Sequence, residues 1–445
     1  MSLRLSDFRD CFEGVIPSII ATTSADGVPN VSYLSHVEEV DDHHIALSNQ
    51  FFGKTARNLR DNPQACVILV DAASGRQARL AVTWLRDEAE GPLFEAMTAS
   101  LRASSAQVGM ADTMRLASVA VFRVDAITAI PHPEGLEAQT QPAPPPRPSL
   151  ERAADAITRI AAETETAGIV DAALDGACRL LDAPAAILFQ FDTERQMLVT
   201  LASRGYLRTG AGSEIAMGHG IAGAAAALGR PVRVSDMSRL RRFGAAIRDT
   251  SSPEEETRTI ALPGMPEAQS QLAVPIHVKG ALYGVLFAES PRRLAFRRDD
   301  AAALSMIGNH AAATLLISEI MAREALPVPP KVGARLPKES FRVVHHTVDD
   351  SVFIDNDYVI RGVAGRLLVY LLERYLVEGR AEFSNREIRL APELRLPDFK
   401  DNLETRLLLL RQRLEEKCCP VRLVRMGRGL IGLQMTHRPE IRRAP

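Results

Sequence analysis

Two proline-dense segments divide the chain and limit what it can fold into. They run from Pro131 to Pro148 (PHPEGLEAQTQPAPPPRP) and from Pro327 to Pro337 (PVPPKVGARLP). Because proline fixes φ and lacks an amide hydrogen, neither segment can form a regular helix or a central strand, and both are expected to be extended spacers. Each of the three blocks that they separate must therefore bury a core of its own.

The length and composition support this division. A chain of 445 residues corresponds to about three domains of roughly 150 residues each, and 46% hydrophobic with 24% charged residues is typical of a globular protein. No apolar run approaches the roughly 18 residues of a membrane span, and the first residues lack a signal-peptide pattern, so we expect a cytoplasmic protein that contacts no membrane. We predict domains at 1–130, 150–325 and 338–445, with linkers at 131–149 and 326–337.

The five cysteines predict neither a disulfide framework nor a metal site. They are scattered, with no C-x-x-C and no Cys/His spacing suited to zinc. Adjacent Cys418 and Cys419 could form a redox pair, but neighbouring residues of an extended segment point their side chains apart. Reduced and mostly buried thiols are the simpler interpretation.

The first block is rich in predicted strands. The runs SIIATTS, NVSYLSHVEEV and HIALS are separated by turn signals at Asp26-Gly27 and Asp41-Asp42, which predicts a meander or a small barrel. CVILVD, ARLAVTWL and SVAVFRVDAITAI add further strands, and GPLFEAMTASLRAS is a helical pattern between the last two.

A polar segment follows the third of these runs and could hold a phosphate. Ser48 and Thr55 offer hydroxyls, Asn49 an amide, and Lys54 a positive charge near the start of a short helical pattern. The same Lys-Thr start is also typical of an ordinary capped turn that faces solvent. The spacing alone leaves both interpretations open.

The segment LSNQFFGKTARNL is similar to the flavin-phosphate segment of the pyridoxamine 5'-phosphate oxidase-like split-barrel proteins. The order G-V-P-N-V-S-Y, acidic turn, A-L-S-N, K-T-x-x-N-L and N-P fits that family over most of the block. The resemblance implies that Ser48, Asn49 and Lys54 contact the phosphate of FMN, that Thr55 lies beside it, and that two copies pair with FMN at their interface. The true oxidases carry a hydroxyl where Phe52 stands, and Arg and Lys on a strand where this chain reads NVSYLSH, so pyridoxamine phosphate is not the expected substrate.

The middle block alternates helical and strand patterns. The segment QLAVPIHVKGALYGVLFAES predicts a hairpin that turns at Lys279-Gly280. A long closing helix carries apolar residues near a heptad seam, which predicts pairing with a second copy. These residues are Leu304, Ile307, Ala311, Leu315 and Ile320.

This block is similar to the GAF family in G-H-G-I-A-G, G-R-P-V-x-V-x-D, L-A-V-P-I, G-A-L-Y-G-V-L and the closing helix. The resemblance implies an α/β/α sandwich that binds a small-molecule effector on one face of its sheet. Gly218, Gly220 and Gly223 fit G-x-G-x-x-G, but no strand of a βαβ unit precedes them and no acidic residue follows at the right distance, so a dinucleotide site is not indicated. The polar segment 243–269 is either a lid over the pocket or a surface loop.

The last block is predicted to contain short strands, three helices and a terminal hairpin, which together make a winged helix. Ser384 followed by Glu387 forms a capping box at the start of the second helix. The whole chain has a net charge of −2, yet from Arg386 to the end there are fourteen basic against eight acidic residues. A local positive surplus is typical of nucleic-acid binding, although a solvated basic face would give the same count.

LRQRLEEKCCPVRLVRMGRGLIGLQ looks like the ending of the winged-helix output domains of two-component response regulators. The resemblance implies that the third helix enters the major groove of DNA, and that the hairpin reaches the minor groove or the backbone. The implied contacts are Lys400, Asn402 and Arg406 on the helix and Arg425 and Arg428 on the hairpin. Leu408 and Leu409 are expected to point outward, and exposed leucines would suit a protein partner better than DNA.

We therefore expect a multidomain α+β protein made of a split β-barrel, a GAF α/β/α sandwich and a C-terminal winged helix. The predicted function is a homodimeric transcription regulator that binds FMN or a small effector and responds through DNA. An FMN-dependent oxidoreductase with regulatory GAF and C-terminal domains is the alternative, and a scaffold that uses Leu408 and Leu409 to dock a partner protein is a third reading. No catalytic residue and no metal ligand is predicted.

Overall fold

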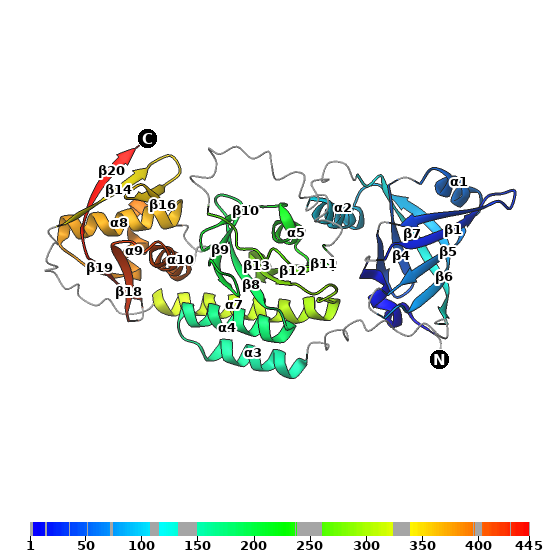
Figure 1. Ribbon diagram of the computed structural model, residues 1–445, viewed down its shortest axis with the longest axis horizontal. Helices are drawn as coiled ribbons and strands as arrows, with labels where there is room; N and C mark the ends of the chain where they lie inside the picture. Colours follow the sequence, from blue (N-terminus) through cyan, green and yellow to red (C-terminus); the bar gives the residue numbers. More distant parts are fainter. Residues whose placement is uncertain are drawn as a thin grey trace.

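The computed structural model arranges three domains in a row, here called the barrel domain, the middle domain and the C-terminal domain (Figure 1). Both predicted linkers fall almost entirely outside the described residues. The structure describes residues 3–13, 16–34, 36–50, 52–71, 74–106, 115–131, 149–235, 237, 260–323, 339–394, 396, 403–427 and 429–444.

The barrel domain is built on one antiparallel, seven-stranded, barrel-like sheet in the order β2-β1-β5-β6-β7-β4-β3. The predicted run NVSYLSHVEEV splits into two strands, β2 and β3, and the predicted helix between the last two strands is present as α2. The elements are η1 (Leu5–Glu13), β1 (Ser18–Thr23), β2 (Pro29–Leu34), β3 (Val37–Asp41), β4 (His44–Asn49), α1 (Gly53–Asp61), β5 (Gln64–Val70), β6 (Gln77–Glu88), α2 (Pro92–Ala106) and β7 (Ser118–Ile130).

The middle domain is a six-stranded antiparallel sheet, in the order β10-β9-β8-β13-β12-β11, with helices on both faces. Helices α3, α4 and α7 share a core with one face, and α5 covers the other. The elements are α3 (Leu150–Ala162), α4 (Thr166–Leu181), β8 (Ala185–Asp192), β9 (Met197–Arg204), β10 (Glu214–Ala216), α5 (Gly220–Leu228), β11 (Val232–Val234), β12 (Ser270–Val278), β13 (Ala281–Ser290) and α7 (Arg298–Arg323).

The hairpin predicted in the middle domain is confirmed. Strands β12 and β13 pair from Ser270 to Ser290, and the two residues between them have positive φ, 50° at Lys279 and 76° at Gly280. Two consecutive left-handed residues are the geometry of a type I′ turn, which matches the twist of the flanking strands.

The prediction that α7 pairs with a second copy through its heptad seam is wrong for four of the five residues. Leu304, Ile307, Ala311 and Leu315 are at most 1% exposed and belong to the core of their own domain. Among the described residues, α7 is also the one helix long and apolar enough to cross a membrane, with 44% of the tested window buried inside the protein. Its apolar character is explained by this packing, because one face of the helix lies against the sheet.

The C-terminal domain contains the predicted strands, three helices and terminal hairpin. One sheet has the order β16-β15-β14-β20 and the other β17-β19-β18. The last strand, β20, was not predicted and pairs in parallel with β14. The elements are β14 (Ser340–His346), β15 (Ser351–Ile354), β16 (Asp357–Ile360), α8 (Val363–Glu378), β17 (Glu382–Ser384), α9 (Asn385–Leu390), η4 (Pro392–Leu394), α10 (Leu403–Glu416), β18 (Val421–Gly427), β19 (Leu430–Met435) and β20 (Arg438–Ala444).

The predicted cap of the second helix is confirmed, since the Ser384 side chain accepts a hydrogen bond from the Glu387 N–H at the start of α9. The assignment of this domain to the winged-helix class stays a prediction. Its core is continuous with that of the middle domain, as one cluster of buried apolar residues runs from α3 of the middle domain to β19 of the C-terminal domain.

Candidate functional site

The start of α1 lies against β2 and places Thr55 in a network of neutral polar groups. The Thr55 side chain is 2% exposed, and its Oγ1 lies 3.0 Å from Asn30 Nδ2 and 2.9 Å from Ser32 Oγ. On the neighbouring strand, Thr22 Oγ1 accepts a hydrogen bond from Asn58 Nδ2 at 3.1 Å. The hydroxyls and amides of three elements, β1, β2 and α1, therefore meet at one place.

Lys54 projects from the same turn and is exposed. The residue before the helix, Phe52, provides no side-chain hydrogen bond to the first turn of α1. A first turn without a side-chain cap leaves amide hydrogens available to an anion, and the adjacent lysine adds a full positive charge. The structure thus brings Lys54 and Thr55 together at a helix start that suits a phosphate group.

Ser48 and Asn49 lie at the end of β4, and only Asn49 bonds to the turn that leads into α1 among the described contacts. The Ser48 hydroxyl is 4% exposed, accepts a hydrogen bond from the His36 N–H at 3.0 Å and donates to the His36 carbonyl at 3.2 Å. Asn49 accepts from the Phe52 N–H at 3.0 Å and donates to Ser118 Oγ at 2.9 Å. The Ser48 side chain therefore ties β4 to the residue before β3, and the Asn49 side chain holds the turn that leads to Lys54 and Thr55.

One face of the middle-domain sheet carries a buried polar cluster. Glu289 on β13 is 1% exposed and accepts hydrogen bonds from the Met265 N–H at 2.7 Å and from Gln271 Nε2 at 2.9 Å. Burial raises the pKa of Glu289, and burial next to this carboxylate raises the pKa of Tyr206. Segment 243–269, predicted as a lid or a loop, lies outside the described residues up to 259, and its last part is tied to β13 by the bond from Met265.

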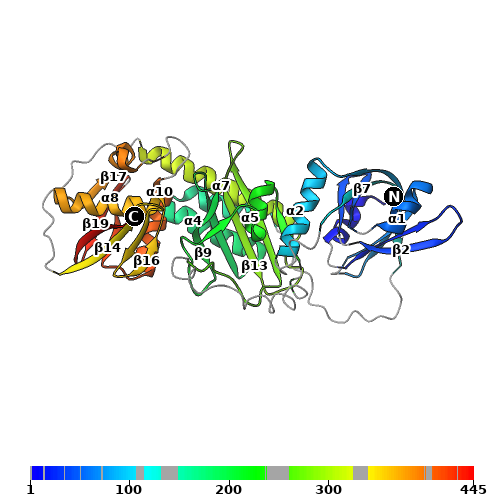
Figure 2. The ribbon, with the colours of Figure 1, turned by 90° about the horizontal axis from the view of Figure 1, so that it is seen from above.

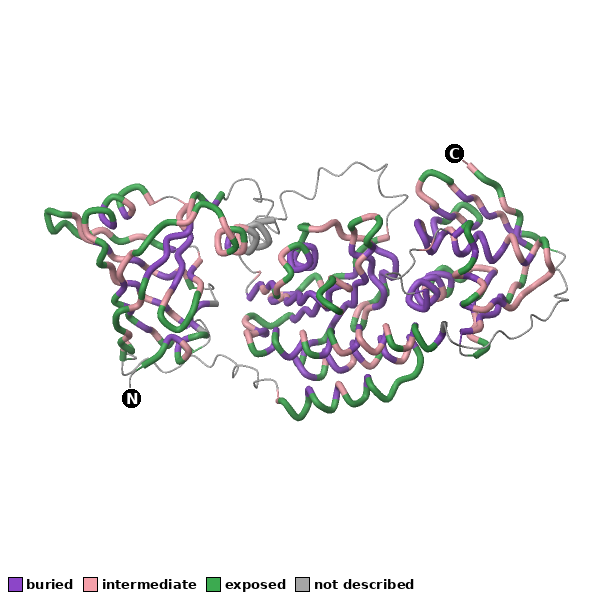
Figure 3. Tube along the Cα trace, turned by 180° about the vertical axis from the view of Figure 1, so that it is seen from behind, coloured by how far each residue is buried: buried purple, intermediate pink, exposed green. Residues whose placement is uncertain are grey.

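Helix α10, the predicted DNA-reading helix, is buried over its first two turns. Every residue from Leu403 to Leu410 is at most 8% exposed, because one side packs on α8 and the other faces the middle domain (Figure 3). The expectation that Leu408 and Leu409 point to solvent is wrong, since they are 5% and 3% exposed. Leu408 lines a small pocket together with Thr166 and Ala167 of α4, and Leu409 lies near Gly212.

The predicted DNA contacts divide into three groups. Arg406 is buried and forms an ion pair at 3.5 Å with Asp192, which ends β8 of the middle domain. Arg425 on β18 is partly exposed and lies 3.9 Å from Glu165 of the middle domain. Lys400, Asn402 and Arg428 lie outside the described residues.

Ion pairs of one polarity join the described parts of the middle and C-terminal domains. In all five of them the carboxylate belongs to the middle domain and the arginine to the C-terminal domain. They are Glu165–Arg425, Asp192–Arg406, Glu194–Arg366, Glu214–Arg361 and Glu319–Arg389.

Among these carboxylates, Glu214 and Glu319 each bind a second group in addition to their arginine across the interface. Glu214 accepts from Arg361 Nε at 3.1 Å and also from Arg195 of its own domain at 2.7 Å. Although burial acts to raise the pKa of Glu214, these two arginines hold it below its usual range. Glu319 is 1% exposed, pairs with Arg389 and accepts a hydrogen bond from the Glu404 N–H, at the start of α10, at 3.1 Å.

The barrel domain meets the middle domain through α2, which packs on α5 (Figure 2). Beside this contact, Glu38 pairs with Arg230 at 3.0 Å and Glu39 pairs with Arg298 at 2.8 Å. Burial acts to raise the pKa of Glu38, but the His36 ring and the Arg230 guanidinium outweigh it and lower that pKa to about 2. Carboxylates of the barrel domain therefore bind arginines of the middle domain.

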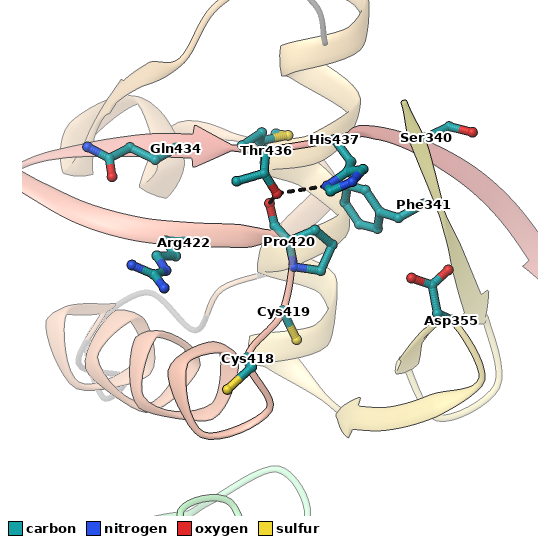
Figure 4. Close-up of a pocket in the computed structure, with 11 residues that line it drawn as sticks. Ser340, Phe341, Asp355, Cys418, Cys419, Pro420, Arg422, Gln434, Thr436 and His437 are labelled. Carbon is teal, nitrogen blue, oxygen red and sulfur yellow. Dashed lines mark hydrogen bonds between the residues drawn. The ribbon is translucent and has the colours of Figure 1, made fainter. Parts of the chain in front are cut away.

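A cavity of about 580 Å³ opens in the C-terminal domain between β14 and the α10–β18 connection. Figure 4 shows the Thr436 hydroxyl bonded both to the Pro420 carbonyl, at 3.1 Å, and to the His437 ring, at 2.8 Å. Cys418 and Cys419 line one side, and burial raises the pKa of Cys419 to about 11, so that thiol stays protonated at neutral pH.

Comparison with known families covers two of the three domains. Residues 6–130 match the family described as pyridoxamine 5'-phosphate oxidase, and residues 165–315 match the GAF domain family. The chain carries a pyridoxamine 5'-phosphate oxidase-like barrel followed by a GAF domain. The middle domain is accordingly called the GAF domain below. None of the curated proteins compared with the chain matches it.

Solved structures resemble single domains of the chain. An FMN-binding protein from Syntrophomonas wolfei subsp. wolfei is 17% identical over 28% of this chain and 86% of its own, with a TM-score of 0.25. The GAF domain of an Acinetobacter phosphoenolpyruvate-protein phosphotransferase is 16% identical over 40% of this chain and 97% of its own, with a TM-score of 0.32. Free methionine-R-sulfoxide reductase from Neisseria meningitidis is 22% identical over 38% and 90% of the two chains, with a TM-score of 0.30.

Proposed function

We propose that the chain is a cytoplasmic sensor that binds FMN in its barrel domain and a small effector in its GAF domain, and that its C-terminal domain binds DNA to regulate transcription. The observation that carries the proposal is the direct packing of α10 on the GAF domain. A receptor can control an output helix only if its two states contact that helix differently. Here the contact is extensive and includes Arg406, one of the expected DNA contacts.

The proposed FMN phosphate site is the start of α1. Lys54 supplies charge and the uncapped first turn its amide hydrogens, a donor set that suits a phosphate. Thr55 is buried and bonded to Asn30 and Ser32, so in this proposal it fixes the start of the helix beside the phosphate. The polar atoms of Ser48 and Asn49 already bond to neighbouring groups, so in this proposal Asn49 acts by holding the turn before α1 and Ser48 by fixing β4 to His36. FMN would supply redox-active or light-absorbing chemistry to the barrel.

The oxidoreductase alternative is not favoured. The described side chains that hydrogen-bond to Thr55, or to its neighbours in the same network, are the hydroxyls and amides of Thr22, Asn30, Ser32 and Asn58. Neutral groups of this kind bind and orient a cofactor but provide no acid–base pair for a substrate.

The DNA-binding part of the proposal depends on the composition and architecture of the C-terminal domain. Three helices and a hairpin follow the order of a winged helix, and the segment from Arg386 carries the positive surplus. Arg422, on the hairpin, remains exposed in this structure. Helix α10 is covered, so a protein in this conformation cannot place that helix in a DNA groove.

The proposed homodimer uses another face of α7 than the sequence pattern predicts. Met306, His310, Ala313, Ile317 and Ile320 follow spacings of four, three, four and three, and Met306, Ile317 and Ile320 are 45%, 57% and 44% exposed. Nε2 of His310 is buried and has no hydrogen-bond partner among the described residues. A heptad stripe of exposed apolar groups is self-complementary across a two-fold axis, so a second copy of this helix fits it.

Two measurements on the purified full-length protein test the proposal. Its absorption spectrum, with and without added FMN, is expected to show flavin bands that stay with the protein through gel filtration. Mobility-shift titration with fragments of the protein's own promoter region at low salt, with and without FMN, is expected to show DNA binding that changes with flavin. A protein that neither retains flavin nor retards DNA contradicts the proposal.

A further inference from the structure

Carboxylates of the GAF domain contact the groups of the C-terminal domain that are expected to bind a nucleic acid. Asp192 faces Arg406, a residue expected to contact DNA. Glu319 accepts the Glu404 N–H at the start of α10 and pairs with Arg389, so an anion occupies the end of the helix where the macrodipole favours negative charge. Nucleic-acid phosphates use the same two kinds of donor, arginine side chains and helix amino ends.

The polarity of the interface is the second observation. If the ion pairs served only to hold the two domains together, carboxylates and arginines could each lie on either domain. In the described interface, all five carboxylates lie on the GAF domain and all five arginines on the C-terminal domain. A sixth carboxylate, Asp171 of the GAF domain, interacts electrostatically with Arg411 of α10 in the C-terminal domain. The acidic group again lies on the GAF domain and the arginine on the C-terminal domain.

The burial of α10 is the third observation. Both the apolar residues, such as Leu408 and Leu409, and the charged Arg406 are covered by the same domain. A duplex and the GAF domain cannot occupy this surface together, because the residues involved are less than 9% exposed. Binding of DNA through α10 must therefore displace the GAF domain.

We infer that the acidic face of the GAF domain, formed by Asp192, Glu214 and Glu319, is a built-in competitor that mimics a polyanion and holds α10 away from DNA. This inference depends on the proposed DNA binding and adds its regulation. If α10 is free in only a small fraction of molecules, the apparent dissociation constant for DNA rises by the inverse of that fraction. An effector that changes the β8–β9 or β10 region of the GAF domain would shift this fraction.

The experiment compares full-length variants in their affinity for a fluorescein-labelled duplex of about 30 base pairs at low salt. The double variant Asp192→Asn and Glu214→Gln removes two carboxylates of the interface and keeps an acceptor oxygen at Asp192 for the Glu194 and Arg195 N–H groups. We expect it to bind at least about tenfold more tightly than the wild type, because buried charge pairs are being broken. The control Asp175→Asn removes the same kind of charge from a site that pairs with Arg179 and Arg204 inside the GAF domain, and should match the wild type.

A variant on the C-terminal-domain side of the interface is a more decisive test, because the inference and simple electrostatics predict opposite changes in DNA affinity. Arg361→Gln removes a positive charge from the C-terminal domain, and simple electrostatics predicts weaker DNA binding. The competition predicts tighter binding, since Glu214 loses its partner across the interface. This variant also replaces the double variant if the latter does not fold.

Hydrogen exchange of residues 403–416 separates this inference from the proposed function. We expect faster exchange there in the double variant and in Arg361→Gln than in the wild type. If the variants expose α10 but all proteins bind the duplex with equal affinity, the inference of a built-in competitor is overturned and the proposed DNA binding survives. If α10 is exposed and no protein binds the duplex, the inference and the proposed DNA binding are both overturned.

If hydrogen exchange of α10 is unchanged in the variants, these ion pairs do not hold the interface. That result overturns the inference alone.

Discussion

At the scale of single residues, Lys54 is the first position to test. It is the exposed positive charge at the start of α1, next to the buried Thr55. We expect Lys54→Ala to weaken FMN binding about tenfold or more, because a hydrogen bond between charged groups is lost. Titration followed by flavin fluorescence measures the change.

Arg60→Ala is the control for that substitution. Arg60 lies in the last turn of the same helix and is also exposed, so its removal lowers the charge of α1 equally without touching the first turn. Equal weakening of FMN binding by both variants would show that Lys54 acts through the general field and not as a phosphate ligand.

Gly284 is a position at which the fold itself requires glycine. It lies in β13, and a Cβ there would meet the carbonyl oxygen of Phe189 on β8 at 2.0 Å. Because that atom is backbone, the two central strands must separate, and we expect Gly284→Ala to destabilise the GAF domain by about 2 kcal/mol. Urea unfolding followed by circular dichroism measures it.

Gly264→Ala is the matched control for Gly284→Ala. No atom lies within 4 Å of its ideal Cβ and its φ is not in the left-handed range, so the added methyl group meets nothing. Loss of stability in both variants would assign the effect to glycine replacement in general.

What the sequence predicts at this scale depends on how local the cause is. The cap of α9 by Ser384 and the turn at Lys279-Gly280 are made within a few residues, and both are confirmed. The surroundings of Arg406 and Leu408 come from a domain more than 200 residues earlier in the chain. A helix with charged and apolar residues on one face gives no sign of whether DNA or another domain will cover it.

At the scale of elements, the apolar periodicity of α7 is correctly recognised in the sequence but is assigned to a second copy of the chain when it belongs to the core of its own domain. Its apolar periodicity is real, but the helix has two apolar faces and the buried one, with Leu304 and Leu315, lies on its own sheet. Periodicity identifies an apolar face without identifying its neighbour. Likewise, strand β20 was missed because its parallel pairing with β14 joins the two ends of the domain.

The exposed face of α7 carries the prediction for the dimer. Ile317 is 57% exposed, the most exposed of the three large apolar residues in the stripe from Met306 to Ile320. We expect Ile317→Glu to convert a dimer to a monomer, because two like charges would face each other across the symmetry axis. Light scattering coupled to gel filtration measures the mass.

Val348→Glu is the control for the dimer variant. Val348 is an apolar, β-branched residue, 85% exposed in the turn between β14 and β15, outside the helix. It should leave the mass unchanged. A wild-type protein that is monomeric at all concentrations, or an Ile317→Glu protein that stays dimeric, contradicts the use of this face.

At the scale of the whole molecule, both junctions follow one rule. Carboxylates of the upstream domain meet arginines of the downstream domain, Glu38 with Arg230 at the first junction and Asp192 with Arg406 at the second. The proline-dense segments predicted three blocks, but they could not show that the last two share a continuous core. Contacts between domains depend on residues distant in sequence, and no single segment carries their pattern.

The first junction carries a prediction about pH. The folded pKa of Glu38 is lowered to about 2 by the His36 ring and the Arg230 guanidinium, against the effect of burial, from an ordinary value of 4.5. A lowered folded pKa stabilises the folded state above the unfolded pKa, and this stability is lost as pH falls through the folded pKa. The contribution of Glu38 is therefore complete above about pH 5, decreases between about 4.5 and 2, and is absent below about 2.

Glu38→Gln tests this directly, since glutamine keeps the shape but cannot ionise. We expect the variant to unfold at a lower temperature than the wild type at about pH 6, and the two melting temperatures to converge toward about pH 2. Glu88→Gln is the control, because Glu88 pairs with Arg86 of its own strand and not with an arginine of the GAF domain in the described ion pairs. A difference between Glu38→Gln and the wild type that persists unchanged into strong acid would mean that Glu38 contributes by its packing, and that the charge pair with Arg230 does not hold the barrel domain to the GAF domain.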